Sequence, residues 1–200
     1  MASATTVHLI RHATYDWIGQ GLAGRTPGLS LNEEGRAQSA RLAAGLRARP
    51  IKAVIASPLE RARETASAIA QQLGIELLTD ESFIELDFGD WTGRVFGTIP
   101  RHEWEAFNTA RTTAFPPGAS ENLIGVQTRS VAGLTRLHER WPKEEIGVVT
   151  HGDVIRCMLV HVLGMDLAFF QRLTVDPASR SLMVVGDDFV RIDGINLPPG

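Results

Sequence analysis

Short runs of consecutive apolar residues alternate along this chain with longer segments in which apolar residues recur every three or four positions. The short runs lie at 7–10, 53–56 and 146–150. Runs of this kind are typical of strands that are buried on both faces of a sheet. The longer segments, which predict amphipathic helices, lie at 32–48, 57–73, 120–141 and 154–163. Strands that alternate with helices favour the α/β class, here a three-layer sandwich in which helices flank a mostly parallel sheet.

Residues that favour capping mark several helix ends. Asn32 is expected to cap the first helix. Ser57-Pro58-Leu59-Glu60 combines a capping serine, a proline at the first helical position and a glutamate three residues after the cap. Ser120 is expected to cap the long helix whose apolar stripe runs from Leu123 to Trp141, and Gly74 ends the second helix.

The remaining segments predict shorter elements. Residues 76–78 are a candidate strand, and 102–107 a short helix. Residues 83–97 are punctuated by glycines and predict an irregular segment. Near the end of the chain, 181–185 and 189–192 predict a hairpin, because the sequence between them favours a turn.

Composition changes this picture little. The chain has 200 residues, of which 44% are hydrophobic and 22% charged, as in an ordinary globular protein. This length favours a single domain over 1–200, in which about 86–120 is a candidate lid. The formal net charge of -3 gives no broad basic surface, so nucleic-acid and membrane partners are not expected. The single cysteine, Cys157, excludes an internal disulfide and is expected to be a buried, inert thiol.

The sequence also bears on location. No segment approaches the roughly 20 apolar residues of a membrane span, and the first residues do not fit a secretory signal. We therefore expect a cytoplasmic protein. A homodimer is left open.

Two histidines that follow predicted strands are the first candidates for chemistry. Arg11 and His12 come directly after the first apolar run, and His151 directly after the last. The carboxyl ends of parallel strands meet at one edge of a sheet, where ligand crevices form. Arg11 keeps its charge, and its planar guanidinium suits phosphate oxygens. Arg61 is expected in the first turn of the second helix, beside the same edge. The combination points to phosphoryl chemistry.

Each of these residues alone has a plainer interpretation. A histidine after a strand is more often structural than catalytic. We assign four other histidines to the structural class: His8, His102, His138 and His161. Arg61 is equally consistent with a surface residue that pairs with Glu60 or Glu64.

Four motifs carry a resemblance to a known family. They are Val7-His8-Leu9-Ile10-Arg11-His12, Ser57-Pro58-Leu59-Glu60-Arg61-Ala62-Arg63-Glu64-Thr65-Ala66, Glu85-Leu86-Asp87-Phe88-Gly89-Asp90-Trp91-Thr92-Gly93 and Val149-Thr150-His151-Gly152. In this order they resemble the histidine phosphatase superfamily, also called the phosphoglycerate-mutase-like family. The resemblance spans about residues 7–155.

The resemblance implies roles for five residues. His12 matches the histidine that attacks phosphorus and becomes phosphorylated. Arg11, Arg61 and His151 match the groups that hold the phosphoryl oxygens. Glu85 matches the residue that protonates the leaving oxygen and then helps water to attack the phosphohistidine; without the motif it reads as a loop carboxylate that faces solvent. Such a mechanism requires no metal and no other cofactor.

The resemblance further implies substrate-binding positions. These are Ala23, Gly24, Arg25 and Gly152, together with the same Arg11, Arg61 and His151. In a proline-glycine-glutamate turn like that of the family, Glu121 either orients the site or merely starts its helix. Three residues after the acid motif either read a second anionic group or face solvent: Arg94, Arg101 and His102.

The chain departs from the family pattern near the nucleophile. Ala13 stands where the family has a glycine, Tyr15 where it has a threonine, and Ile18 where an asparagine often follows the tryptophan. Ile18 cannot donate a hydrogen bond to phosphate as the asparagine would, so the effect of these changes on turnover and on the substrate class is left open.

The function favoured by the sequence is a metal-independent phosphatase that acts on a small phosphomonoester through a phosphohistidine on His12. One alternative is a phosphoglycerate-type mutase, and another is a weakly active regulatory module that binds a phosphorylated ligand. The stretch between Glu85 and His151 is shorter than the arginine-rich insertion usual in the family's mutases, which favours the phosphatase.

Overall fold

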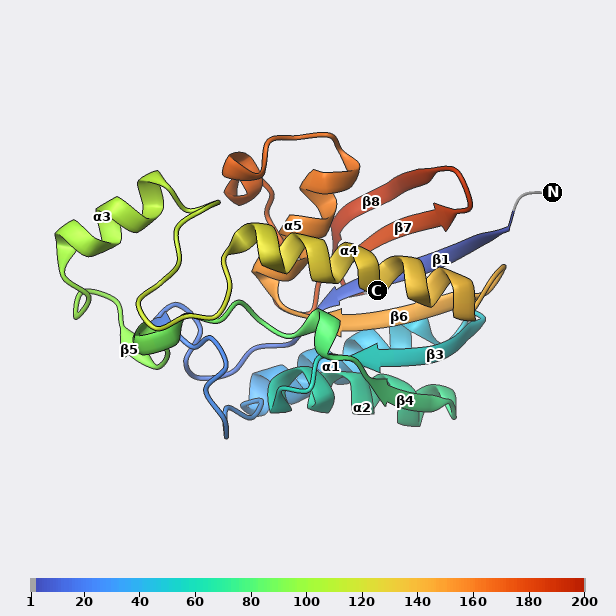
Figure 1. The fold of residues 1–200 in the computed structure, drawn as a ribbon. Helices are drawn as coiled ribbons and strands as arrows, with labels where there is room; N and C mark the ends of the chain where they lie inside the picture. Colours follow the sequence, from blue (N-terminus) through green and yellow to red (C-terminus); the bar gives the residue numbers. More distant parts are fainter. Residues whose placement is uncertain (1–2, 200) are drawn as a thin grey trace.

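The computed structural model describes residues 3–199, which build a six-stranded sheet with the strand order β4-β3-β6-β1-β7-β8 (Figure 1). The strands are β1 Ala4–Arg11, β3 Ile51–Ala56, β4 Glu76–Thr79, β6 Glu145–Thr150, β7 Arg180–Gly186 and β8 Val190–Leu197. Strands β4, β3, β6 and β1 are parallel, whereas β7 pairs antiparallel with both β1 and β8. The α/β class is confirmed, and the predicted hairpin adds an antiparallel edge to the sheet.

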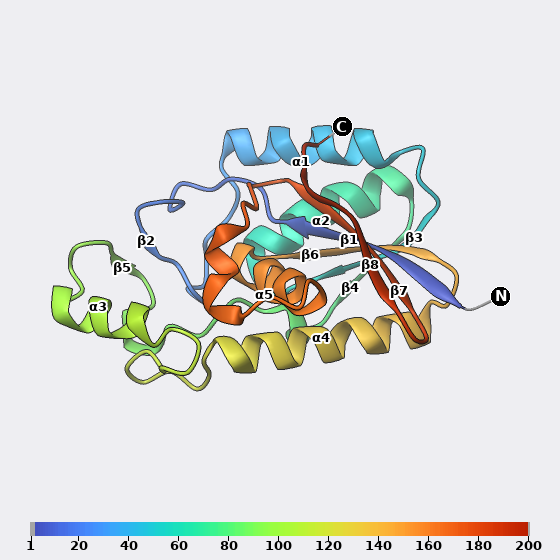
Figure 2. The same ribbon diagram turned by 90° about the horizontal axis from the view of Figure 1, so that it is seen from above.

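Helices cover both faces of this sheet (Figure 2). Helices α1 (Glu33–Leu46) and α2 (Glu60–Leu73) pack on one face, and α4 (Leu123–Arg140) and α5 (Gly152–Val162) on the other. Side chains alternate along the strands, so Val7 and Leu9 join the core under α4 and α5 while Ile10 joins the core under α1 and α2. Two apolar layers on one strand explain why the strands read as almost unbroken apolar runs.

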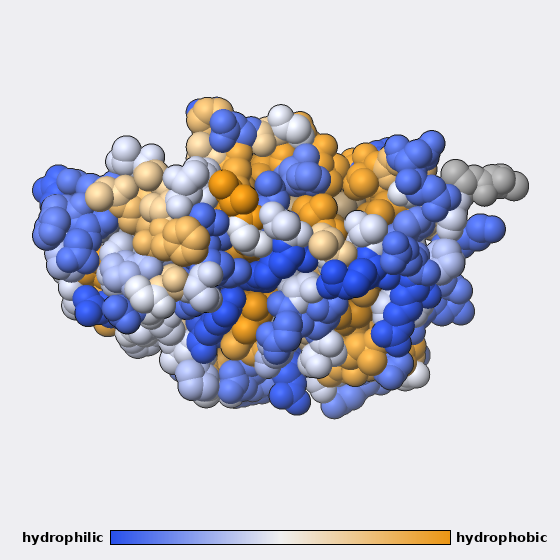
Figure 3. All heavy atoms as spheres, viewed as in Figure 1, coloured by the Kyte–Doolittle hydropathy of each residue, from blue (hydrophilic) through white to orange (hydrophobic). Residues whose placement is uncertain are grey.

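The face of the molecule that carries α4 shows both polar and apolar side chains (Figure 3). Figure 3 shows hydrophilic side chains over much of the face that carries α4, as expected for the solvent side of an amphipathic helix. No helix in the described part of the chain has the length and apolar character that a membrane crossing requires.

A smaller part of the chain lies beyond the carboxyl ends of β1 and β6 (Figure 1). It contains the two-stranded ribbon β2 (Gly21–Leu22) and β5 (Arg94–Val95), the helix α3 (Arg101–Thr109) and the 3-10 turn η2 (Gly89–Trp91). Two further 3-10 turns are η1 (Glu81–Phe83) and η3 (Leu167–Arg172). Trp91, Trp104 and Phe107 pack their rings together and stabilise this part.

Two of the predicted helix caps are confirmed. The Asn32 side chain accepts a hydrogen bond from the backbone N–H of Gly35 at 2.8 Å and so caps α1. Gly74 ends α2 with a φ of 65°, a conformation that glycine adopts without a Cβ clash.

The other two predicted caps are wrong. Helix α2 begins at Glu60 without a side-chain cap, because the Ser57 hydroxyl lies 2.7 Å from Nε2 of His151. Helix α4 is capped by Asn122, whose side chain accepts from the Gly125 N–H at 3.0 Å. Ser120 instead donates its hydroxyl to Asp87 at 2.7 Å. In both cases a distant partner uses the hydroxyl that the local pattern assigns to a cap.

Candidate active site

A cavity of about 290 Å³ opens at the carboxyl ends of β1, β3 and β6. Arg11 and His12 from the end of β1, Arg61 from the first turn of α2 and Glu85 from the loop after η1 all line it. His151, the residue before α5, lies directly behind, with its ring centroid 5.2 Å from that of His12. The structure thus brings together the five residues that the motifs single out.

His12 is held by the backbone of its own sheet. Its N–H donates to the Thr150 carbonyl at 2.9 Å, and its ring Nδ1 lies 2.8 Å from the Ala13 carbonyl oxygen. A carbonyl only accepts, so Nδ1 carries the proton and Nε2 carries the lone pair. Burial, with the Arg61 and Arg11 charges nearby, holds the pKa of His12 well below its usual range. The ring is therefore neutral and nucleophilic near pH 7.

Two arginines present unused donors. Arg61 is 1% exposed and donates one N–H to the Gly24 carbonyl at 2.8 Å, but its Nε and second terminal nitrogen have no partner among residues 3–199. Arg11 donates to the Val175 carbonyl at 2.7 Å, and its buried Nε likewise lacks a partner in the described chain. Buried donors without acceptors are costly, so a cluster of them suits an anion with several oxygens.

His151 is oriented by Ser57 and Arg61. Its Nε2 lies 2.7 Å from the Ser57 hydroxyl, and its Nδ1 lies 3.4 Å from a terminal nitrogen of Arg61 and 3.8 Å from Oε2 of Glu85. Since the guanidinium only donates, the neutral ring directs the Nδ1 lone pair toward Arg61 and donates from Nε2 to Ser57. Burial and the Arg61 charge lower the pKa of His151 well below its usual range.

The carboxyl group of Glu85 has a raised pKa. Burial, with the Asp153 charge nearby, raises its pKa to about 7, although Arg61 and the Leu86 N–H oppose the shift. The side chain is 15% exposed, and its Oε1 accepts from the Leu86 N–H at 2.9 Å. The Glu85 carboxyl group can therefore hold a proton near neutral pH, where an ordinary glutamate is ionised.

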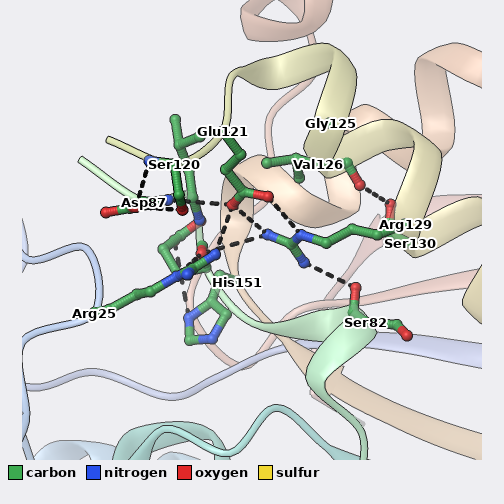
Figure 4. Close-up of polar contacts among 12 residues, drawn as sticks. Arg25, Ser82, Asp87, Ser120, Glu121, Gly125, Val126, Arg129, Ser130 and His151 are labelled. Carbon is green, nitrogen blue, oxygen red and sulfur yellow. Dashed lines mark hydrogen bonds and ion pairs between the residues drawn. The ribbon is translucent and has the colours of Figure 1, made fainter. Parts of the chain in front are cut away.

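The predicted substrate-binding positions separate into two groups. Ala23, Gly24 and Gly152 line the cavity. Arg25 does not line it. Its guanidinium instead donates to the carbonyl of Glu85 in the loop 84–88, called the acid loop below, at 2.9 Å, and to the Glu121 carboxylate at 2.7 Å (Figure 4). Of the two roles considered for Glu121, the structure favours orientation of the site.

The residues proposed to read a second anionic group lie elsewhere. Arg94, Arg101 and His102 are exposed and do not line the cavity. The Arg101 side chain is 90% exposed and pairs with Glu105 on the surface of α3.

One wall of the cavity is formed by residues that the sequence motifs do not single out: Arg111, Asp153 and Arg156. Arg156 donates to the Asp153 carboxylate at 3.0 Å, and Arg111 lies 3.5 Å from its other oxygen. The Arg111 guanidinium also lies over the Phe170 ring, 5.1 Å from the centroid. Asp153 and Arg156 could have been found, because helical spacing places both in the first turns after His151. Arg111 follows α3 without such a signal.

The departures from the family pattern are accommodated. Ala13 is fully buried without a positive φ, and its N–H donates to the Thr65 hydroxyl at 3.0 Å. The Tyr15 ring lies edge-on to His12 at 5.3 Å between centroids and 5.3 Å from the guanidinium carbon of Arg61. Ile18 lines the cavity with its apolar side chain.

The structure also bears on the single cysteine and on metal binding. Cys157 is buried, and burial raises the pKa of its thiol, as expected for an inert cysteine. Within residues 3–199, no three His, Cys, Asp or Glu side chains are arranged to hold a metal ion.

Comparisons with known proteins relate this chain to one family. The sequence matches the histidine phosphatase superfamily (branch 1) over residues 7–198. It is 30% identical over 182 residues to phosphoserine phosphatase 1 of Hydrogenobacter thermophilus, which covers 88% of this chain and 84% of the relative. It is 35% identical over 155 residues to phosphoglycerate mutase-like protein 4 of Arabidopsis thaliana, which covers 75% of this chain and 67% of the relative. A solved mycobacterial glucosyl-3-phosphoglycerate phosphatase has a TM-score of 0.84 at 25% identity and covers 97% of this chain and 99% of that one.

Proposed function

The chain belongs to the histidine phosphatase superfamily, branch 1, and is a phosphatase of that family, and from this premise we propose that it hydrolyses a small phosphomonoester through a phosphohistidine on His12. The observation that carries the proposal is the neutral His12 ring, whose Nε2 carries the lone pair, beside buried donors of Arg11 and Arg61 that have no partner within residues 3–199. A nucleophile and an anion site meet there within one cavity.

In the first step, Nε2 of His12 attacks phosphorus while the bond from phosphorus to the ester oxygen breaks. Glu85 gives its proton to the leaving oxygen, so an alcohol departs and a carboxylate remains. Arg11 and Arg61 neutralise the charge on the three phosphoryl oxygens, since phosphoryl transfer depends mainly on positioning and electrostatics. The bound anion also favours the protonated form of His151, whose second N–H then becomes a donor.

In the second step, the Glu85 carboxylate takes a proton from water, and the water oxygen attacks phosphorus. The nitrogen-to-phosphorus bond breaks, its electron pair returns to Nε2 of His12, and inorganic phosphate leaves. The cycle thus converts one ester and one water into an alcohol and phosphate, with Glu85 protonated again. The cationic charge that the transfer needs comes from Arg11 and Arg61, so we propose that no metal takes part.

The organic half of the substrate is expected to face the outer part of the cavity. Phe96, Trp104 and Arg111 line this part and come from the segment 86–120, for which we keep the proposal of a lid. The cavity volume of about 290 Å³ suits a small ester.

Labelling tests the nucleophile. After brief exposure to a phosphate ester from a mixed panel and an alkaline quench, we expect label on His12. His12→Ala should abolish turnover, and Arg61→Ala should lower it by roughly 10²–10³. The matched control is His102→Ala, an exposed histidine outside the cavity, which should leave turnover unchanged. Label on His151, serine or aspartate, or loss of activity in excess chelator that a metal ion restores, would contradict the proposed mechanism.

A further inference from the structure

We propose that Arg25, Glu121 and Arg129 form a clamp that positions Glu85 for proton transfer, an inference that rests on Glu85 being the general acid of the proposed function. None of the three residues lines the cavity. They act through the backbone of the acid loop and are positioning residues rather than catalytic ones.

Glu121 is the centre of the clamp (Figure 4). Its Oε1 accepts from Arg25 at 2.7 Å and from a terminal nitrogen of Arg129 at 2.9 Å, and its Oε2 accepts from Nε of Arg129 at 2.9 Å. The Arg129 contact is thus bidentate, a geometry that fixes the planes of both groups. The side chains of Glu121 and Arg129 are 14% and 21% exposed, so solvent screens the pair less than it screens a surface pair.

Both arginines also donate to backbone carbonyls in or next to the acid loop. The Glu85 carbonyl accepts from Nε of Arg25 at 2.9 Å and from Arg129 at 3.4 Å. Arg129 also donates to the Ser82 carbonyl at 2.8 Å, and Glu121 accepts from the Asp87 N–H at 3.2 Å. The backbone on both sides of Glu85 is therefore tied to one carboxylate.

These ties matter because the acid loop is not part of a helix or a strand. No hydrogen-bond ladder therefore holds residues 84–88. A general acid must meet the leaving oxygen within hydrogen-bond distance. The clamp fixes the Glu85 backbone and, with it, the direction of the side chain.

The clamp also connects the acid to the anion site. Arg25 follows Gly24, whose carbonyl accepts from Arg61 at 2.8 Å. Because Arg25 in turn holds Glu85, the acid and the phosphoryl-binding arginine are placed relative to each other by one short segment. This assigns Arg25 a positioning role in place of the substrate contact that the family resemblance implies.

The test compares two leaving groups in the variant Arg129→Met. An alkyl phosphate needs a proton on its leaving oxygen, whereas a nitrophenyl phosphate does not. We expect kcat/KM for the alkyl ester to fall by roughly 10- to 100-fold. For the nitrophenyl ester it should change by less than about threefold, because phosphoenzyme formation proceeds there without the acid.

Arg136→Met is the matched control. Arg136 lies on α4 like Arg129 and donates to the Ser82 hydroxyl at 2.5 Å, but it contacts neither Glu85 nor Glu121. Its substitution should leave both esters unaffected. If Arg129→Met fails to fold, Glu121→Gln, which keeps the size of the side chain and removes the charge, takes its place in the same comparison.

Glu85→Gln separates failure of the clamp from failure of the proposed function. If Glu85→Gln slows the alkyl ester selectively and Arg129→Met does not, the clamp alone is overturned. Equal losses on both esters in Arg129→Met also overturn it, because they indicate a merely structural role. If Glu85→Gln itself shows no selectivity, the general acid and the clamp are overturned together.

Discussion

Burial acts on His12 and Glu85 in opposite directions, because it disfavours the charged form of each. It lowers the pKa of the histidine and raises that of the carboxyl group to about 7. Near neutral pH the same environment thus provides a neutral imidazole that can attack phosphorus and a neutral carboxyl group that can protonate the leaving oxygen. Such separation of neighbouring pKa values is a usual sign of assigned acid and base roles.

The raised pKa predicts a pH dependence. As the pH rises through about 7, Glu85 loses the proton that the leaving oxygen needs, so kcat/KM for an alkyl phosphate should fall about tenfold per pH unit above that value. The acid limb should lie well below pH 6.5, where His12 becomes charged. Initial rates from pH 4 to pH 10 measure both limbs.

A nitrophenyl phosphate is the control for this profile. It is ionised like the alkyl ester above pH 7 but needs no general acid, so its alkaline limb should be absent. The same limb with both esters would show that the titrating group is not the proton donor.

At this scale the sequence predicted the residues that we propose to carry the reaction, and it offered Glu121 as a group that orients the site, but it did not point to Arg129. Arg11, His12 and His151 follow strands, and Arg61 starts a helix, so each has a local signal. Arg129 lies within α4, far from Glu85 in the sequence, and nothing in the adjacent sequence indicates its contact with the Glu85 carbonyl. Contacts of this kind depend on tertiary packing alone.

Among the elements, periodicity predicted all the main strands and helices within a few residues of their bounds. The helix ends were less predictable, because a side chain of the capping type can form its hydrogen bond with a distant residue and not with the helix N-terminus. Ser57 and Ser120 have the residue type of a cap, but His151 and Asp87 take their hydroxyls. The antiparallel hairpin was predictable from its turn, whereas its pairing with β1 was not.

Two glycines test the close approach of elements around the site. Gly89 and Gly74 both have a positive φ. A Cβ atom added at Gly89 would lie 2.2 Å from the Pro117 carbonyl oxygen, whereas a Cβ atom added at Gly74 would meet no atom of residues 3–199 within 4 Å apart from its chain neighbours. Gly89→Ala should therefore cost about 3 kcal/mol or more in the free energy of unfolding. Gly74→Ala should cost only about 1 kcal/mol, from backbone strain. Denaturant titration measures both, and similar losses would show that the Pro117 turn simply moves aside.

For the whole molecule, the layered arrangement places every proposed catalytic group at one edge of the sheet. The segment 86–120 adds only the helix α3, the short strand β5 and the 3-10 turn η2 beside it. A mutase must keep water from its phosphoenzyme until the product has reoriented. We therefore expect hydrolysis to exceed transfer in this protein. With 3-phosphoglycerate and its bisphosphorylated primer, inorganic phosphate should appear with negligible formation of 2-phosphoglycerate. Interconversion that is faster than phosphate release and depends on the primer would favour the mutase instead.

The buried charge of Arg61 affects the stability of the protein when no ligand is bound. Arg61 forms no ion pair with a carboxylate of residues 3–199, and such a cation lowers the stability of the ligand-free fold. Any small oxyanion that occupies its donors stabilises the protein by mass action. Inorganic phosphate is such an oxyanion and is also the product of a phosphatase, so we expect it to compete with the next ester for the same nitrogens. We therefore expect a higher concentration of free phosphate to raise the free energy of unfolding and to lower the fraction of sites that are free for a new substrate.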